Sequence, residues 1–186
     1  MSRARATVNA NDDAREIQEL DEASRAAIAE TVGIGGIKYA DLHHNRESDY
    51  IFNWDKMLSV TGDTATYIQY SYARINGIFR RGNVDLDRIR KEVELCLENP
   101  AERGLAIQIL QYSEILEQVI KELKPNLLTD YLFGTANSFS TFYEKCPVLK
   151  EENEELRYSR LFLCDLTSRI LKHGLSMLGI NTSEKM

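Results

Sequence analysis

From Ala65 onward, apolar residues recur at the three- and four-residue spacing of an α-helix, and this spacing constrains the fold most strongly. Thr64 can cap that helix, because its hydroxyl can accept an amide proton of the first turn. The segment Arg80–Arg81–Gly82 is a suitable end, with cations at the negative end of the helix dipole and a glycine for a left-handed cap. The apolar side of the predicted helix carries Ile68, Tyr72, Ile75 and Phe79.

The rest of the chain repeats this pattern, and strand-like alternation never extends beyond a few residues. Asn99–Pro100 and Lys124–Pro125 mark helix starts, and Cys146–Pro147 marks a helix end. Ser113 is the expected cap of the helix that begins at 114. The sequence therefore predicts an all-α bundle of about six to seven helices. The expected helices are 12–32, 65–82, 84–97, 101–111, 114–123, 125–145 and 151–174.

Three glycines, Gly33, Gly35 and Gly36, follow the first of these helices. A glycine cluster can form a phosphate-binding loop. The frame of such a loop is missing here, since no strand precedes the glycines and no Gly-Lys-Ser/Thr follows them. We therefore expect the glycines to stop the helix and form a tight turn.

The pair His43–His44 raises the question of a metal site. Neighbouring side chains point apart in a strand and about 100° apart on a helix, so such a pair rarely binds one ion, and no third ligand stands nearby in the sequence. We expect surface histidines in a loop and no metal.

Composition restricts the class of protein. Of the 186 residues, 43% are hydrophobic, enough for one sizeable core. No apolar run approaches the roughly 20 residues of a membrane span, and no apolar segment follows Arg3 and Arg5 as in a secretory signal. The three cysteines are far apart and odd in number, which favours reduced thiols in a cytoplasmic protein over a disulfide framework. No membrane partner is expected.

Charge is distributed unevenly. The net charge of −6 argues against a strong nucleic-acid binder, and no DNA partner is expected. However, residues 70–91 hold six cations and two anions, whereas residues 11–30 hold seven anions and two cations. The basic stretch could dock a phosphate backbone, or both stretches could be solvated helix faces.

Four ordered blocks carry a family resemblance. The run FNWDKMLSVTGDTATYIQYSYARI, residues 52–75, resembles the start of the C-terminal helical domain of arginyl-tRNA synthetases. Upstream lies VGIGGIKYADL, residues 32–42. Downstream lie FYEKCPV, residues 142–148, and RLFLCDLTSRILKHGLSMLGI, residues 160–180. The resemblance covers about Glu30 to Met186. Residues 1–11 are small, polar and aperiodic, and we expect a flexible leader there. The resemblance implies a linking helix and loop from the catalytic side at 12–48 and an anticodon-binding helical domain at 49–186.

The resemblance implies binding of the arginine tRNA by this part of the enzyme. Anticodon bases are unstacked, and proteins hold such bases by stacking on aromatic rings. Without the resemblance, each tyrosine could equally be a half-buried core residue with a bonded hydroxyl. The sequence departs from the family where Thr66 replaces a proline and where Asn181 to Lys185 replace a Pro-Glu-Arg ending before the terminal Met. The implied anticodon contacts are Tyr70, Arg74, Tyr143 and Met186, and we expect Tyr67 of the same helix beside them. The expected contacts with the RNA backbone are Lys38, Arg80 and Arg81.

Catalytic parts of a class I synthetase are not recognisable. That chemistry needs an α/β nucleotide-binding fold and a His-x-Gly-His loop. Lys56 to Ser59 resembles the phosphate-binding Lys-Met-Ser-Lys-Ser loop, but Val60 replaces the second lysine, so Met57 and Leu58 are expected in the core. We expect no aminoacylation and no cofactor in this chain, with ATP bound elsewhere in the parent enzyme.

A second interpretation stays open: a free-standing helical domain that binds protein, such as the missing catalytic domain. Exposed Tyr70 and Tyr143 lining one groove with Arg74 would favour RNA. An exposed aliphatic patch would favour a protein partner.

Overall fold

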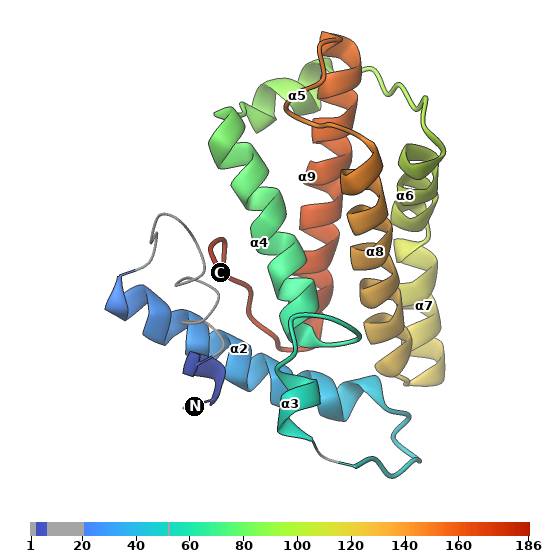
Figure 1. Ribbon diagram of the computed structural model, residues 1–186. Helices are drawn as coiled ribbons and strands as arrows, with labels where there is room; N and C mark the ends of the chain where they lie inside the picture. The colour runs from blue at the N-terminus through green and yellow to red at the C-terminus, as the bar shows by residue number, and fades with distance from the viewer. Residues whose placement is uncertain (1–2, 7–20, 52) are drawn as a thin grey trace.

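A computed structural model describes residues 3–6, 21–51 and 53–186, and these residues contain helices and no strand (Figure 1). The prediction of an all-α bundle is confirmed. The helices, named as in Figure 1, are α2 (Glu22–His43), α3 (Trp54–Met57), α4 (Ala65–Gly82), α5 (Leu86–Glu92), α6 (Pro100–Leu110), α7 (Tyr112–Glu122), α8 (Asn126–Lys145) and α9 (Glu154–Met177).

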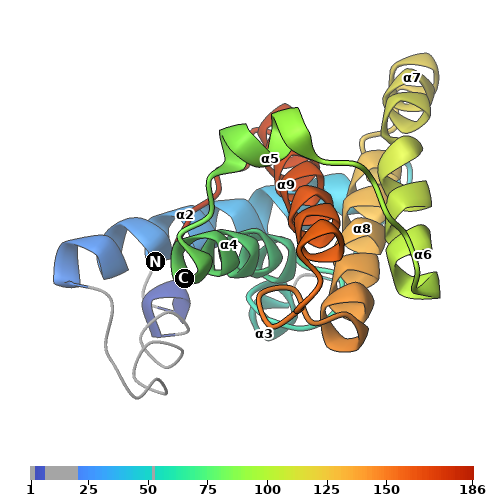
Figure 2. The ribbon, with the colours of Figure 1, turned by 90° about the horizontal axis from the view of Figure 1, so that it is seen from above.

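Four long elements form the bundle. Helices α4, α9, α8 and the α6–α7 pair run roughly parallel to one another, while α2 crosses beneath α4 and α8 (Figure 1). Viewed from above, α8 separates α4 from α6 (Figure 2). After α9 the chain turns back and ends beside α4. Within the described residues, no helix is both long and apolar enough to cross a membrane.

The main core lies where α4, α8 and α9 face one another. Its fully buried members include Ile68 and Ile75 of α4, Leu132 and Phe139 of α8, and Leu171 of α9. The predicted cap of α4 is confirmed, since Thr64 Oγ1 accepts the Tyr67 amide proton at 3.1 Å. The left-handed residue after the helix is Asn83, with φ of 43°, one position beyond the expected glycine.

The expected helix stop at Gly33, Gly35 and Gly36 is wrong, because all three are buried inside α2. A Cβ atom at Gly35 would lie 2.8 Å from Gln69 Nε2, and one at Gly36 would lie 3.2 Å from a Leu58 methyl. The glycines therefore permit close approach of α4 and the α3 segment to α2.

Two other expected boundaries also differ. The helix expected over 84–97 is α5, which ends at Glu92. The Cys96 backbone instead bonds the Ser159 hydroxyl of α9 in both directions, at 3.0 Å and 2.7 Å, and this pairing competes with helical bonds. Ser113 is not a cap, because α7 begins at Tyr112 directly after a turn at Gln111.

Only part of the prediction for the N-terminal residues can be compared with the structure. The helix start at Asp12 and most of the leader at 1–11 lie outside the described residues. Residues 3–6 are helical, and Ala4 is buried in a small cluster that includes Val32, Leu58 and Met186. This part of the expected leader is packed against the fold. Of the two residues expected in the core, Leu58 is buried as predicted, whereas Met57 is only half-buried.

A buried ion pair joins α6 to α9. Glu102, fully buried, completes the cap of α6 by accepting the Asn99 amide at 2.8 Å. Its other oxygen accepts Arg160 Nε at 2.6 Å. Arg160 also donates to the Pro147 carbonyl at 2.8 Å, which fixes the turn after α8.

Candidate nucleic-acid interface

Tyr70 and Arg74 lie one helical turn apart on α4, on the side away from the core. The Arg74 guanidinium carbon lies 4.9 Å from the centre of the Tyr70 ring. Arg74 Nη2 also lies 3.5 Å from the Tyr70 hydroxyl, the limit of a hydrogen bond. The cation over the ring face holds both side chains in a fixed relation.

Tyr143 reaches the same place from the last turn of α8. Its ring centre lies 5.7 Å from the Arg74 guanidinium carbon, so the cation contacts two tyrosines from two helices. Phe139, in the core, stacks on the Tyr143 ring at 5.9 Å between centres. All three polar residues are half-buried. The structure brings Tyr70, Arg74 and Tyr143 together, and we call these three residues the Tyr–Arg–Tyr cluster.

Tyr67 lies at the same α4–α8 boundary, one turn before Tyr70. Its hydroxyl donates to Asn137 Oδ1 at 3.0 Å, and its ring packs edge-on against Phe133 at 5.8 Å. Both partners belong to α8. Tyr67 thus holds the two helices together, and its hydroxyl is already engaged.

Met186 is buried, 7% exposed, in the cluster that also contains Ala73 of α4, the residue before Arg74. Gln69 Nε2 donates to the Asn181 carbonyl at 2.8 Å, which holds the tail before it reaches this cluster. The altered ending therefore still places Met186 against α4.

Lys38 and Arg80, expected at an RNA backbone, both donate to carbonyls of the C-terminal tail. Lys38 Nζ bonds Gly179 O at 2.5 Å, and Arg80 Nη1 bonds Glu184 O at 2.8 Å. Because a carbonyl is neutral, the positive charge of each side chain remains available at the surface. The structure thus gives both residues a role in positioning the tail.

Arg81 borders a polar groove of about 490 Å³ between the end of α4, α5 and the start of α9. The guanidinium carbons of Arg88 and Arg157 lie 5.6 Å and 5.9 Å from the centre of the Tyr158 ring in this groove. Sequence reasoning missed Arg157 and Tyr158, because only the fold brings α9 beside α5. The basic stretch at 70–91 was the available signal.

An exposed apolar surface lies over α2 and α3. Ile34, Ile37 and Trp54 are 43%, 44% and 38% exposed, and they line a groove of about 340 Å³. Ile51, in the segment between the helices, is 94% exposed. We call the surface formed by Ile34, Ile37 and Trp54 the α2–α3 surface.

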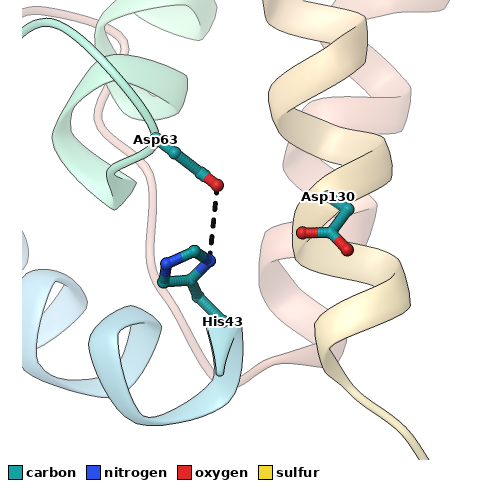
Figure 3. Close-up of side chains that lie close together, drawn as sticks. All are labelled: His43, Asp63 and Asp130. Atoms are coloured by element: carbon teal, nitrogen blue, oxygen red, sulfur yellow. Dashed lines mark ion pairs between the residues drawn. The ribbon is translucent and has the colours of Figure 1, made fainter. Parts of the chain in front are cut away.

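The histidine pair also lies at the end of α2. His43 is the last helical residue and His44 the cap, so the expectation of a loop is wrong. His43 faces Asp63 before α4 and Asp130 of α8 (Figure 3). These carboxylates are 20 and 87 positions away in the sequence, and spacing alone gave no sign of either.

Known proteins resemble both ends of the chain. Residues 68–186 match the family described as DALR anticodon binding domain, and residues 1–54 match tRNA synthetases class I (R), catalytic domain. The arginine–tRNA ligase of Rippkaea orientalis is 50% identical over 173 residues, 93% of this chain and 29% of that protein. The arginine–tRNA ligase of Synechococcus elongatus is 47% identical over 186 residues, 100% of this chain and 31% of that protein.

The same likeness holds in three dimensions. A crystal structure of arginyl-tRNA synthetase from Plasmodium falciparum superposes with a TM-score of 0.88 at 33% identity, over 100% of this chain and 32% of that one. The chain therefore spans less than a third of the length of these relatives. Because residues 68–186 are more than half of the chain, the protein belongs to the DALR anticodon-binding domain family.

Proposed function

We propose that this chain is the tRNA-binding, anticodon-recognising part of an arginine–tRNA ligase, and that the Tyr–Arg–Tyr cluster holds anticodon-loop bases. The observation that carries the proposal is the position of Arg74 against the rings of Tyr70 and Tyr143. Two aromatic faces and one guanidinium plane supply stacking partners for unstacked bases and a charge for the phosphates between them.

Order in the free protein strengthens this proposal. Phe139 supports Tyr143 from the core, and Arg74 bridges to Tyr70, so the stacking faces are set before RNA arrives. Preordered side chains lower the entropy that binding must overcome. The half-buried state of all three residues also leaves part of each side chain open to solvent.

The parent reaction belongs to the proposal as well. The relatives that the chain matches are named arginine–tRNA ligases, and the chain spans less than a third of them. Attachment of arginine with ATP would occur in the remaining part of such an enzyme, in the cytoplasm. We retain residues 12–48 as the link to that part and residues 49–186 as the RNA-binding domain.

A salt titration tests the function. The chain is titrated with arginine tRNA and with an unrelated tRNA at several salt concentrations, and affinity is read by fluorescence anisotropy. We expect tighter binding of arginine tRNA and a logarithmic slope of about 0.7 for each single-stranded phosphate contacted. Equal affinity for both tRNAs at every salt concentration would refute anticodon recognition.

The α2–α3 surface supports a second function, contact with the catalytic domain of the same enzyme. Ile34, Ile37 and Trp54 expose apolar area on the segment that matches the catalytic family. An apolar surface of this kind is characteristic of an interface that another domain covers. This contact complements RNA binding, because the α4–α8 boundary carries the Tyr–Arg–Tyr cluster.

Mixing the separate parts tests this contact. A catalytic fragment from a related arginine–tRNA ligase is titrated with the chain, and complex formation is measured by calorimetry. Ile37→Asp should weaken the complex by placing a charge in the apolar interface. Ile120→Asp is the matched control, since Ile120 is 72% exposed on α7. Equal effects of the two variants would rule out the α2–α3 surface as the contact.

A further inference from the structure

Three side chains with metal-binding atoms meet where α2, the turn before α4 and α8 come together. His43, Asp63 and Asp130 each offer one ligand atom, and these atoms lie within 4.8 Å of one another. Figure 3 shows His43 and Asp63 facing each other, with the Asp130 carboxylate turned toward them from α8. The three residues come from segments that are far apart in the chain.

The ring nitrogen of His43 has an unusual environment. Its Nδ1 atom lies 3.3 Å from Asp63 Oδ2, yet that atom is buried and has no partner in hydrogen-bonding geometry among the described residues. A buried polar atom without a hydrogen bond is costly and rare. Nδ1 of a neutral imidazole can instead donate its lone pair to a metal ion.

Tyr39 orients two of the three groups. Its buried hydroxyl donates to Asp63 Oδ1 at 2.5 Å, which leaves Asp63 Oδ2 toward His43. Its ring also stacks on the His43 ring, with centres 5.8 Å apart and planes 14° apart. Metal sites commonly have such a second layer of residues, which fixes the direction of the ligands.

Charge also favours a cation at this place. Two carboxylates that face the same point repel each other when both are ionised. A divalent cation between them would remove this repulsion. One nitrogen and two oxygen donors are a set that Zn²⁺ accepts, with water at the remaining position.

We propose that His43, Asp63 and Asp130 bind one divalent cation of the Zn²⁺ class at the junction of α2 with the helical bundle. Two ligands of a tetrahedral Zn²⁺ stand about 3.4 Å apart at bond lengths near 2.1 Å. The ligand atoms, now within 4.8 Å of one another, would therefore move closer by up to about 1.4 Å on binding. The proposal is independent of RNA binding.

A cation at this site would link two segments of the chain that match different families. His43 lies in the segment that matches the catalytic family, Asp130 in the segment that matches the anticodon-binding family, and Asp63 between the two. A cation held by all three would cross-link α2 to α8 and fix the angle between the two segments.

Zinc titration of the metal-free chain tests the site. After treatment with a chelator, the 186-residue protein is titrated with ZnCl₂ by calorimetry, and its Tm is measured with and without Zn²⁺. We expect one ion per chain and a Tm rise of about 5–10 °C at a free Zn²⁺ concentration near 100 times Kd. His43→Ala, Asp63→Asn and Asp130→Asn should each abolish this rise.

Two further variants distinguish Zn²⁺ binding at the three proposed ligands from nonspecific Zn²⁺ binding. His44→Asn is the matched control, because His44 is the adjacent histidine but bonds the Ala40 carbonyl and stacks on Tyr50. It should keep the affinity of the unsubstituted chain. Tyr39→Phe should weaken Zn²⁺ binding by about 10–100-fold through loss of ligand orientation. A Tm rise that survives His43→Ala, or the lack of one-to-one binding in the unsubstituted chain, would overturn the proposal.

Discussion

The guanidinium carbon of Arg74 on α4 lies 5.7 Å from the centre of the Tyr143 ring on α8. This contact joins two helices whose contributing residues are 69 positions apart in the sequence. It also makes the candidate RNA site a product of the packed bundle, since neither helix alone presents both groups. Substitutions at this site should therefore separate effects on binding from effects on folding.

Tyr143→Ala should weaken RNA binding by about 1–3 kcal/mol if the ring stacks on a base. The free energy of unfolding should fall less, by about 0.5–1.5 kcal/mol for the lost contact with Phe139. Tyr72→Ala is the control, because Tyr72 is 4% exposed in the core and its loss should cost about 3–5 kcal/mol of stability. Urea unfolding and tRNA titration of both variants measure the difference. A destabilised Tyr143 variant whose folded fraction keeps full affinity would place the ring in the core.

Arg74→Ala should lower RNA affinity and reduce the salt slope by about 0.7 if the guanidinium meets a phosphate. Arg103→Ala is the control, because it removes an equal charge from an exposed position on α6. Helix α6 lies on the far side of α8 from α4 (Figure 2). That control should leave the slope unchanged. An unaltered slope with reduced affinity for Arg74→Ala would assign the side chain to stacking on bases only.

The helices of the bundle could be predicted because their signals are local. The hydroxyl cap at Thr64 and the Asn99–Pro100 start depend on residues within one turn, and both are present. The course of α2 could not be predicted, since Gly35 and Gly36 interrupt a local pattern for a reason that lies elsewhere. Gly35 and Gly36 make room for the side chains of Gln69 and Leu58. These contacts come from distant parts of the chain, so local spacing cannot predict them.

The candidate site was predictable only where the family resemblance supplied the residues. Helical spacing places Tyr70 and Arg74 on one face of α4, whereas Tyr143 reaches them only through the packing of α8 against α4. The tail contacts of Lys38 and Arg80 follow from the return of the chain along α4, a long-range feature without a local signal. For the same reason, sequence spacing could not indicate that Asp63 and Asp130 lie near His43.

Met186→Ala should loosen the C-terminal tail, because Met186 is buried beside Ala73 and Val32. RNA affinity should then fall, since a mobile tail must be ordered again on binding at about 0.5–1.5 kcal/mol for each immobilised side chain. Hydrogen exchange of residues 181–186 and tRNA titration measure the two effects. Lys185→Ala changes an exposed neighbour and serves as the control. A mobile tail with unchanged affinity would remove Met186 from the RNA site.

Glu102→Ala should cost about 3–5 kcal/mol of stability, because it removes the buried carboxylate that pairs with Arg160 Nε and accepts the Asn99 amide, and it leaves Arg160 with Glu151 as its remaining ion-pair partner. The comparison is Lys124→Ala, which breaks a half-exposed pair with Glu122 and should change stability by less than about 1 kcal/mol. Urea unfolding measures both. Similar losses in the two variants would mean that the buried pair adds nothing beyond a surface contact.

Alanine at two helical glycines should have opposite effects on stability. At Gly174 of α9 the added Cβ would lie 2.6 Å from a Leu132 methyl in the core, so Gly174→Ala should destabilise by about 1–3 kcal/mol through overpacking. At Gly104 of α6 the space is open, and its backbone is helical, so Gly104→Ala should stabilise by about 0.5–1 kcal/mol through lower entropy of the unfolded chain. Thermal and urea unfolding give the two signs directly. Stabilisation by Gly174→Ala would mean that α8 and α9 are packed less tightly than the structure indicates, because only a looser contact leaves room for the extra methyl group.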